Sequence, residues 1–371
     1  LGTRQLEAAA PLAAVLRPSV RLSVRPTARG DRPMPVNLLA TLSLAYSPPP
    51  IIGGQGELRF EYRPDRLALP KGASLRNAHG LVTDAAGRIF FTYEHGGNDT
   101  NCLVRWEADG TGARFLTAGG KALCEGVPHG LQLSDEEGHE FLYHANNEQK
   151  LTKTRLDGSI VWQRSGNFGQ DPRLPYRPTW FATPPGPFVY LCDGYGSNRI
   201  YAFDKQSGAW AAGRVWGGKG GREQHGNFST NHGCTYDVTA DRIAVSDRAN
   251  SRIEFYDYGR AGEPALEYSH TLDLRRTMGG GSLPCNLRTY PGQGGRGISP
   301  DLSGPVAVLD AAGRVASVVN VSVLLGPLGH SHPHDAILLP SGDMAVAEWN
   351  PGFVTYWKRL PSPARAGDVV G

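Results

Sequence analysis

Short runs of alternating apolar and polar residues recur along the chain from residue 51 onward, and Gly, Asp or Asn bounds most of them. GELRFEYR shows the pattern plainly, with Leu58, Phe60 and Tyr62 on every second position. Such runs are typical of short antiparallel strands joined by tight turns. The 48 Gly and 28 Pro residues leave no room for long helical patterns, which disfavours a helical bundle or a coiled coil.

Six strand-like runs start in a similar way: AHGLVTD, PHGLQLS, PTWFATP, NHGCTYD, PCNLRTY and PHDAILL. Their anchor residues are His79, His129, Trp180, His232, Cys285 and His334. The anchors follow one another at intervals of 49 to 53 residues, and strands and turns follow each of them. Six units in phase predict an all-β fold, a six-bladed β-propeller with four-stranded antiparallel blades. A tandem pair of β-sandwiches, the alternative, leaves the phased anchors unexplained.

The ends of the chain differ in composition from the repeats. Residues 1–50 contain six Arg and only two acidic residues, which resembles an organelle transit peptide, while a start at Met34 would give a short secretory apolar region. The sequence therefore predicts a targeting or disordered segment over 1–50, the propeller over 51–360 and a tail over 361–371. The residues at 56–63 are expected to supply the strand that closes the ring. An organelle and the secretory pathway both stay open as locations.

Charge and cysteine content exclude several classes of protein. The formal net charge is +3 and basic residues do not cluster after residue 32, so no nucleic-acid surface is expected. No apolar stretch approaches the ~18 residues that a membrane span needs. Five cysteines without a CxxC pair exclude a zinc ribbon, and the odd count is compatible with one or two disulfides.

Histidine is the anchor in four of the six units. His129, His232 and His334 belong to blades two, four and six, so a propeller would bring them to one mouth of its axis at roughly equal angles. Three neutral imidazoles suit Zn²⁺ and leave a fourth position open for water or substrate. Imidazoles that only line the channel wall are the alternative, and His79 in blade one is expected to have that role.

Further polar residues are expected near the same mouth. DGYGSNRI places Tyr195, and SDRANSRI places Arg248, at corresponding turns of blades three and four. A tyrosine near zinc can assist proton transfer, and an arginine offers a fork for a carboxylate. Asp335 follows His334 directly and either holds a hard cation such as Ca²⁺ or acts as a hydrogen-bond acceptor at the strand entry. Arg252 is expected to be structural and to tie one blade to the next.

The segments VPHGLQLS, LCDGYGSNRIYAF, NHGCTYDVTADRIAVSDRANSRIEFY and HPHDAILLPSGDMAVAEWN make the chain resemble NHL-type six-bladed propellers. More closely, it resembles peptidyl-α-hydroxyglycine α-amidating lyases (peptidylamidoglycolate lyases). The resemblance implies zinc on three histidines, which fall on His129, His232 and His334. It also implies functional roles for Tyr195 and Arg248, and a structural calcium held in part by Asp335.

The sequence departs from that family at three places. A first-blade arginine has no counterpart, since Glu94 and His95 occupy that region; Gly196 replaces a cysteine, so the family's local disulfide is absent; and His332 replaces a methionine. The resemblance implies cleavage of the N–C bond of a carbinolamide, with a peptide or small-molecule substrate in the central funnel.

Two other functions remain compatible with the sequence. One is a non-catalytic propeller whose face binds a protein partner or a glycan. The other is a metal-dependent lactonase or esterase, which would require several acidic or amide ligands around Ca²⁺ rather than histidines.

Overall fold

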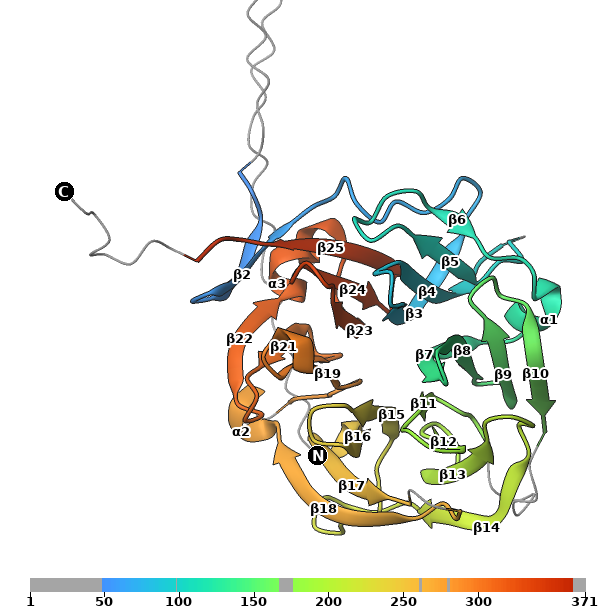
Figure 1. Ribbon diagram of the computed structural model, residues 1–371. Coiled ribbons are helices and arrows are strands. Elements are labelled where there is room, and N and C mark those ends of the chain that lie inside the picture. The colour runs from blue at the N-terminus through green and yellow to red at the C-terminus, as the bar shows by residue number, and fades with distance from the viewer. Residues whose placement is uncertain (1–48, 98, 167–175, 260–261, 279–280, 363–371) are drawn as a thin grey trace, which may run out of the picture. The chain divides into compact units, whose positions relative to one another are not determined.

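The computed structural model describes residues 49–362 except 98, 167–175, 260–261 and 279–280. Within this range the strands form six antiparallel sheets arranged around a common axis (Figure 1). The protein is a six-bladed β-propeller, as the phased anchors predict. Most of the expected targeting segment, and the tail beyond residue 362, lie outside the described residues.

The strands follow the order of the chain from the innermost to the outermost position in five blades. The strands of blades one, two and three are β3 (Leu75–Thr83), β4 (Ile89–His95), β5 (Leu103–Trp106), β6 (Arg114–Phe115), β7 (Pro128–Glu136), β8 (His139–Asn146), β9 (Lys150–Arg155), β10 (Ile160–Ser165), β11 (Trp180–Ala182), β12 (Phe188–Cys192), β13 (Arg199–Asp204) and β14 (Trp210–Gly217). Those of blades four and five are β15 (Asn231–Asp237), β16 (Arg242–Asp247), β17 (Arg252–Tyr258), β18 (Leu266–Asp273), β19 (Arg288–Tyr290), β20 (Arg296–Pro300), β21 (Pro305–Leu309) and β22 (Val315–Asn320).

Blade six joins the two ends of the described chain. Its inner strands are β23 (Pro333–Leu338), β24 (Met344–Glu348) and β25 (Phe353–Arg359), and its outer strands are β2 (Leu58–Tyr62) and β1 (Ile52–Gln55). β2 pairs with β25 through Phe60 opposite Arg359 and Tyr62 opposite Trp357, so the predicted closing strand is confirmed. β1 adds a fifth strand that the sequence did not indicate.

Helices are few and short in the described range: α1 (Gly120–Cys124), α2 (Arg275–Met278), α3 (Val321–Leu325) and the 3-10 turns η1 (Arg248–Asn250), η2 (Pro291–Gln293) and η3 (Gly326–Leu328). None of these is long and apolar enough to cross a membrane. One disulfide joins Cys102, next to β5, to Cys124 at the end of α1, while the other three cysteines are buried thiols.

The core lies between neighbouring blades, and strand β24 shows why. Met344 and Val346 pack in the core shared with blade five, whereas Ala345 and Ala347 pack in the core shared with blade one. Alternate side chains of a strand point to opposite faces, so a blade packed on both sides needs apolar residues at every position. This is why MAVA reads as a continuous apolar run.

Candidate metal centre

Each of the four anchor histidines lies at a break in the pairing of its innermost strand. The register shifts fall between Ala78 and Leu81, Pro128 and Leu131, Asn231 and Gly233, and Pro333 and Asp335. A β-bulge leaves a residue unpaired and re-aims its side chain. β11 and β19 pair without such a shift, and blades three and five contribute no histidine.

The four imidazole rings meet in one buried cluster. The ring centroid of His129 lies 4.5 Å from that of His79, 4.9 Å from that of His232 and 4.7 Å from that of His334. The ring of His334 is also 4.6 Å from His232 and 4.8 Å from His79. All four side chains are at most 2% exposed. The structure therefore brings the predicted trio together and adds His79 to it.

Backbone carbonyls of the following blades hold three of these rings. Nδ1 of His129 lies 2.9 Å from the carbonyl oxygen of Thr179, and Nδ1 of His232 lies 2.8 Å from that of Cys285. Nδ1 of His334 lies 3.4 Å from the carbonyl oxygen of His79. Because a carbonyl only accepts, each Nδ1 carries the proton and each Nε2 presents a lone pair.

A glycine beside the histidine makes this contact possible. A Cβ atom on Gly130 would lie 2.2 Å from the carbonyl oxygen of Thr179, and one on Gly233 would lie 2.5 Å from that of Cys285. Any side chain at these two positions would therefore push away the carbonyl that holds the neighbouring ring. The HG pairs of blades two and four thus have a physical basis in close packing between blades.

The chemistry of the cluster fits a metal ion. Nε2 of His129, His232 and His334 is buried and has no hydrogen-bond partner in the described part of the chain. An unsatisfied buried acceptor costs about 1–3 kcal/mol, which a bound cation would offset. Burial lowers the pKa of His129 to about 3 and lowers the pKa of His232 and His334 well below the ordinary value. The rings are therefore neutral, as metal ligands must be.

His79 differs from the other three histidines. Neither of its ring nitrogens has a hydrogen-bond partner among the described residues, and its Nε2 lies 4.0 Å from a carboxylate oxygen of Glu94 on β4. One ligand atom each from His79, His129 and His334 all lie within 4.8 Å of one another, a group able to hold a metal ion. Sequence reasoning treated His79 as a wall residue, although it shares the anchor position of the other three.

Tyr195 and Arg248 lie beside the cluster. Arg248 donates a hydrogen bond from Nη1 to the Tyr195 hydroxyl at 3.0 Å. The Tyr195 ring centroid lies 5.3 Å from that of His129 and 5.4 Å from that of His232. Burial raises the pKa of Tyr195, and the positive charge of Arg248 opposes part of this rise. The phenol is therefore protonated at neutral pH and suited to donate a proton.

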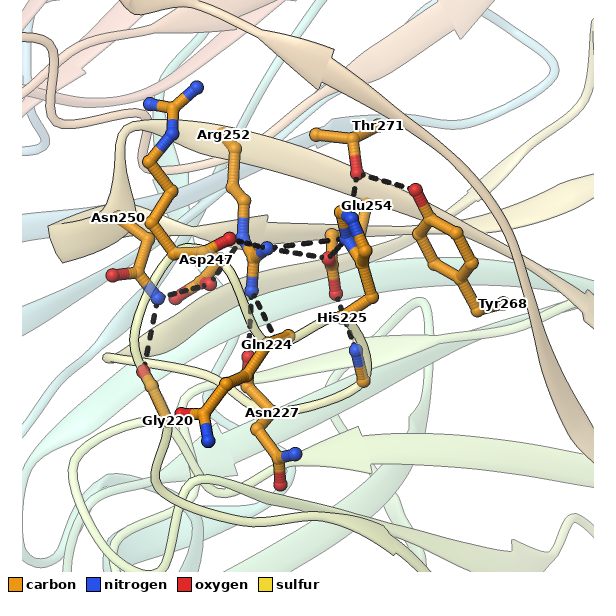
Figure 2. A network of polar contacts seen from close by, with 12 residues as sticks. Gly220, Gln224, His225, Asn227, Asp247, Asn250, Arg252, Glu254, Tyr268 and Thr271 are labelled. Carbon is orange, nitrogen blue, oxygen red and sulfur yellow. Dashed lines mark hydrogen bonds and ion pairs between the residues drawn. The ribbon is translucent and has the colours of Figure 1, made fainter.

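A buried polar network holds the segment that carries Arg248 (Figure 2). Arg252 pairs through Nε with Asp247 at 2.8 Å and through Nη1 with Glu254 at 2.9 Å. Its Nη2 donates to the carbonyl oxygens of Gln224 and Asn227, in the loop that leads from blade three to blade four. Arg252 thus ties this loop to the blade, consistent with the structural role expected from its sequence position.

Asp335 accepts hydrogen bonds from two neighbouring blades, and its expected role at a calcium ion stays a prediction. Its Oδ2 accepts from Nη2 of Arg288 at 2.8 Å and from the backbone N–H of Leu81 at 2.8 Å. Its Oδ1 accepts from Asn286 and from the backbone N–H of Ala336. A guanidinium already neutralises this carboxylate, so it acts as an acceptor that joins blades five, six and one.

Trp180 contacts both the histidines and Arg288, a role that its place as an anchor did not indicate. Its ring lies 6.0 to 6.2 Å from those of His129, His232 and His334, and the Arg288 guanidinium lies 5.8 Å from it. The position that corresponds to the histidines in blade three is the preceding residue, Thr179, whose carbonyl receives Nδ1 of His129. The blade-three anchor expected from the sequence was therefore one residue too late, at Trp180 instead of Thr179.

Comparisons with known proteins support the fold. No protein-family model and no curated protein matches the chain. Among solved structures, a structural-genomics target described as a gluconolactonase is 15% identical, with 79% of this chain and 96% of that one covered and a TM-score of 0.50. Luciferin-regenerating enzyme is 10% identical, with 84% and 96% covered and a TM-score of 0.53. A streptogramin B lyase is 11% identical, with 81% and 88% covered and a TM-score of 0.49. At these identities the likeness to the first two structures shows the propeller fold alone.

Proposed function

We propose that this protein is a zinc-dependent lyase that cleaves the N–C bond of a peptidyl-α-hydroxyglycine or a similar carbinolamide. The observation that carries the proposal is the clustering of the His129, His232 and His334 rings, whose Nε2 atoms have no hydrogen-bond partner among the described residues, next to the Tyr195–Arg248 pair. The sequence resemblance supplies the reaction class, and the neutral, carbonyl-oriented imidazoles supply a donor set suited to zinc.

The reaction converts an N-acyl-α-hydroxyglycine into a primary amide and glyoxylate. The C–N bond breaks, the carbinol carbon becomes an aldehyde, and the hydroxyl proton is balanced by one delivered to nitrogen. A zinc ion on the three histidines would supply Lewis acidity toward the carbinol oxygen. Tyr195, a protonated phenol, is the donor to the leaving nitrogen, and it recovers its proton from the hydroxyl.

Arg248 has two tasks in this scheme. Its Nη1 holds the Tyr195 hydroxyl at 3.0 Å, which orients the phenol. Its guanidinium would bind the substrate carboxylate through N–H groups not used for Tyr195 or for its contact with Cys285, and a lysine cannot reproduce a two-pronged contact of this kind. A peptide whose last residue is α-hydroxyglycine carries this carboxylate next to the scissile bond, so the substrate class and the site chemistry agree.

The test uses a benzoyl-α-hydroxyglycine substrate, glyoxylate release as the readout and metal content measured on the same preparations. His232→Ala should lose both zinc and turnover, whereas His139→Ala, an exposed histidine on β8, should keep both. Turnover by His232→Ala without zinc would contradict the proposal. An unaltered chain without zinc or turnover would instead favour a propeller whose face binds a protein or glycan.

A further inference from the structure

The His79 side chain is the least satisfied of the clustered histidines. It is 2% exposed, and neither ring nitrogen has a hydrogen-bond partner in the part of the chain that the structure describes. A neutral imidazole carries one donor and one acceptor, and each costs about 1–3 kcal/mol when buried without a partner. His129, His232 and His334 each have one nitrogen satisfied by a carbonyl. His79 therefore gains most from a bound ligand.

The position of His79 suits coordination to the same ion. Ligand atoms of His79, His129 and His334 lie within 4.8 Å of one another. Imidazole nitrogens bound tetrahedrally to one zinc ion are about 3.4 Å apart, so a shift of up to about 0.8 Å per ring brings the three onto one ion. The register shift between Ala78 and Leu81 gives the ring the same kind of bulge as its three counterparts.

One ion is enough for all four histidines. His129 and His334 lie between His79 on one side and His232 on the other, and both contact each of these rings. His129 and His334 each use Nδ1 in a bond to a carbonyl, so each has one nitrogen left for one ion. An ion shared by His79 and His232 is therefore the simplest arrangement that uses all four rings.

We propose that His79 is a fourth imidazole ligand of the metal ion, so that substrate enters as the fifth ligand from the side of Tyr195 and Arg248. This inference rests on the metal site of the proposed function but not on the reaction. Glu94 lies near the same ring: its carboxylate accepts from the Asn77 side chain and is 4.0 Å from Nε2 of His79, beyond hydrogen-bond distance. A small shift of the ring on binding the ion would let this carboxylate orient it from behind.

The experiment uses Co²⁺ as the probe metal in the full chain. Four-coordinate Co²⁺ absorbs visible light more strongly than five-coordinate Co²⁺, so the coordination number can be read from the spectrum. In the absence of substrate a water would take the fifth position of the unaltered protein, so we expect it to be five-coordinate and to absorb weakly. His79→Ala, with three imidazoles and a water, should be four-coordinate and absorb more strongly. It should also bind Co²⁺ at least about 100-fold more weakly, since even partners behind a ligand affect metal affinity 10–100-fold. The exposed His139→Ala variant is the matched control and should match the unaltered chain.

Several outcomes decide the matter. A His79→Ala variant with unchanged Co²⁺ affinity and spectrum would overturn the proposal, as would an unaltered chain that binds no Co²⁺. If His79→Ala does not fold by circular dichroism, His79→Gln is measured in its place with the same criteria. A chain that coordinates Co²⁺ through His79 but releases no glyoxylate with zinc would keep the fourth ligand and reject the lyase. Glyoxylate release by the unaltered chain, together with unchanged Co²⁺ binding by His79→Ala, would keep the lyase and reject the fourth ligand.

Discussion

Replacing Arg252 with methionine should lower the free energy of unfolding by about 3–5 kcal/mol. Methionine keeps the apolar stem of the side chain but removes the charge that sits 2.8 Å from Asp247 and 2.9 Å from Glu254. Both carboxylates are fully buried. The cost is large because two buried negative charges lose their partner, and the loop carbonyls held by Arg252 lose their donor as well.

Urea denaturation followed by fluorescence measures the effect as a change of midpoint at unchanged slope. Arg242→Met, in the same blade, is the matched control: its ion pair with Asp257 is exposed, and such pairs contribute about 0–1 kcal/mol. If Arg252→Met lowers the free energy of unfolding no more than Arg242→Met does, the reasoning is refuted.

The free energy of unfolding of Arg252→Met should also depend on pH differently from that of the unaltered protein. Burial already raises the pKa of Asp247, and hydrogen bonds together with Arg252 oppose that rise. Removing Arg252 raises the pKa of Asp247 further above its unfolded value. A buried carboxyl with a raised pKa lowers the free energy of unfolding as pH rises through that pKa. The difference in free energy of unfolding between Arg252→Met and the unaltered protein should therefore be smaller at pH 5 than at pH 7. An equal deficit at both values would contradict this explanation.

Three further variants test other parts of the structure. Gly130→Ala should weaken zinc binding about tenfold, because its Cβ would displace the carbonyl that orients the His129 ring. Gly221→Ala is the control, since no atom lies near its Cβ. Equal zinc affinities of the two variants would contradict the role of Gly130. Tyr195→Phe should keep zinc by elemental analysis but lower glyoxylate release at least about 100-fold, and unchanged turnover would remove the phenol from the mechanism. Cys102→Ser should lower the free energy of unfolding in urea by about 3 kcal/mol, since the disulfide to Cys124 closes a loop of 22 residues. Reductant should have no effect on this variant, which lacks the disulfide. If the substitution changes the free energy of unfolding no more than reductant changes that of the variant, the disulfide does not stabilise the fold.

The ring itself was predictable because each blade must pack on both sides. That requirement repeats the same apolar strands and glycine turns every fifty residues, and it keeps the anchors in phase. The grouping of His129, His232 and His334 followed from the phase, since alternate blades bring equivalent positions to one mouth of the axis at roughly equal angles.

The finer features depend on contacts between segments far apart in the sequence. Nothing in the residue pattern shows the bulge between Ala78 and Leu81 that aims His79 at the cluster. Asp335 pairs with Arg288 of the preceding blade, a contact that its own sequence context does not show. Thr179 and Trp180 are adjacent, and only the pairing shows which of them corresponds to the histidines.

The closing strands give biosynthesis of this protein a fixed order of events. Phe60 on β2 pairs with Arg359 on β25, about 300 residues later. At the ~5–20 residues per second of a ribosome, β2 waits about 15–60 s for its partner to be made. During this interval its edge is unpaired and open to strands of other nascent chains. The ring can therefore close only after β25 has been made, however stable the finished ring is.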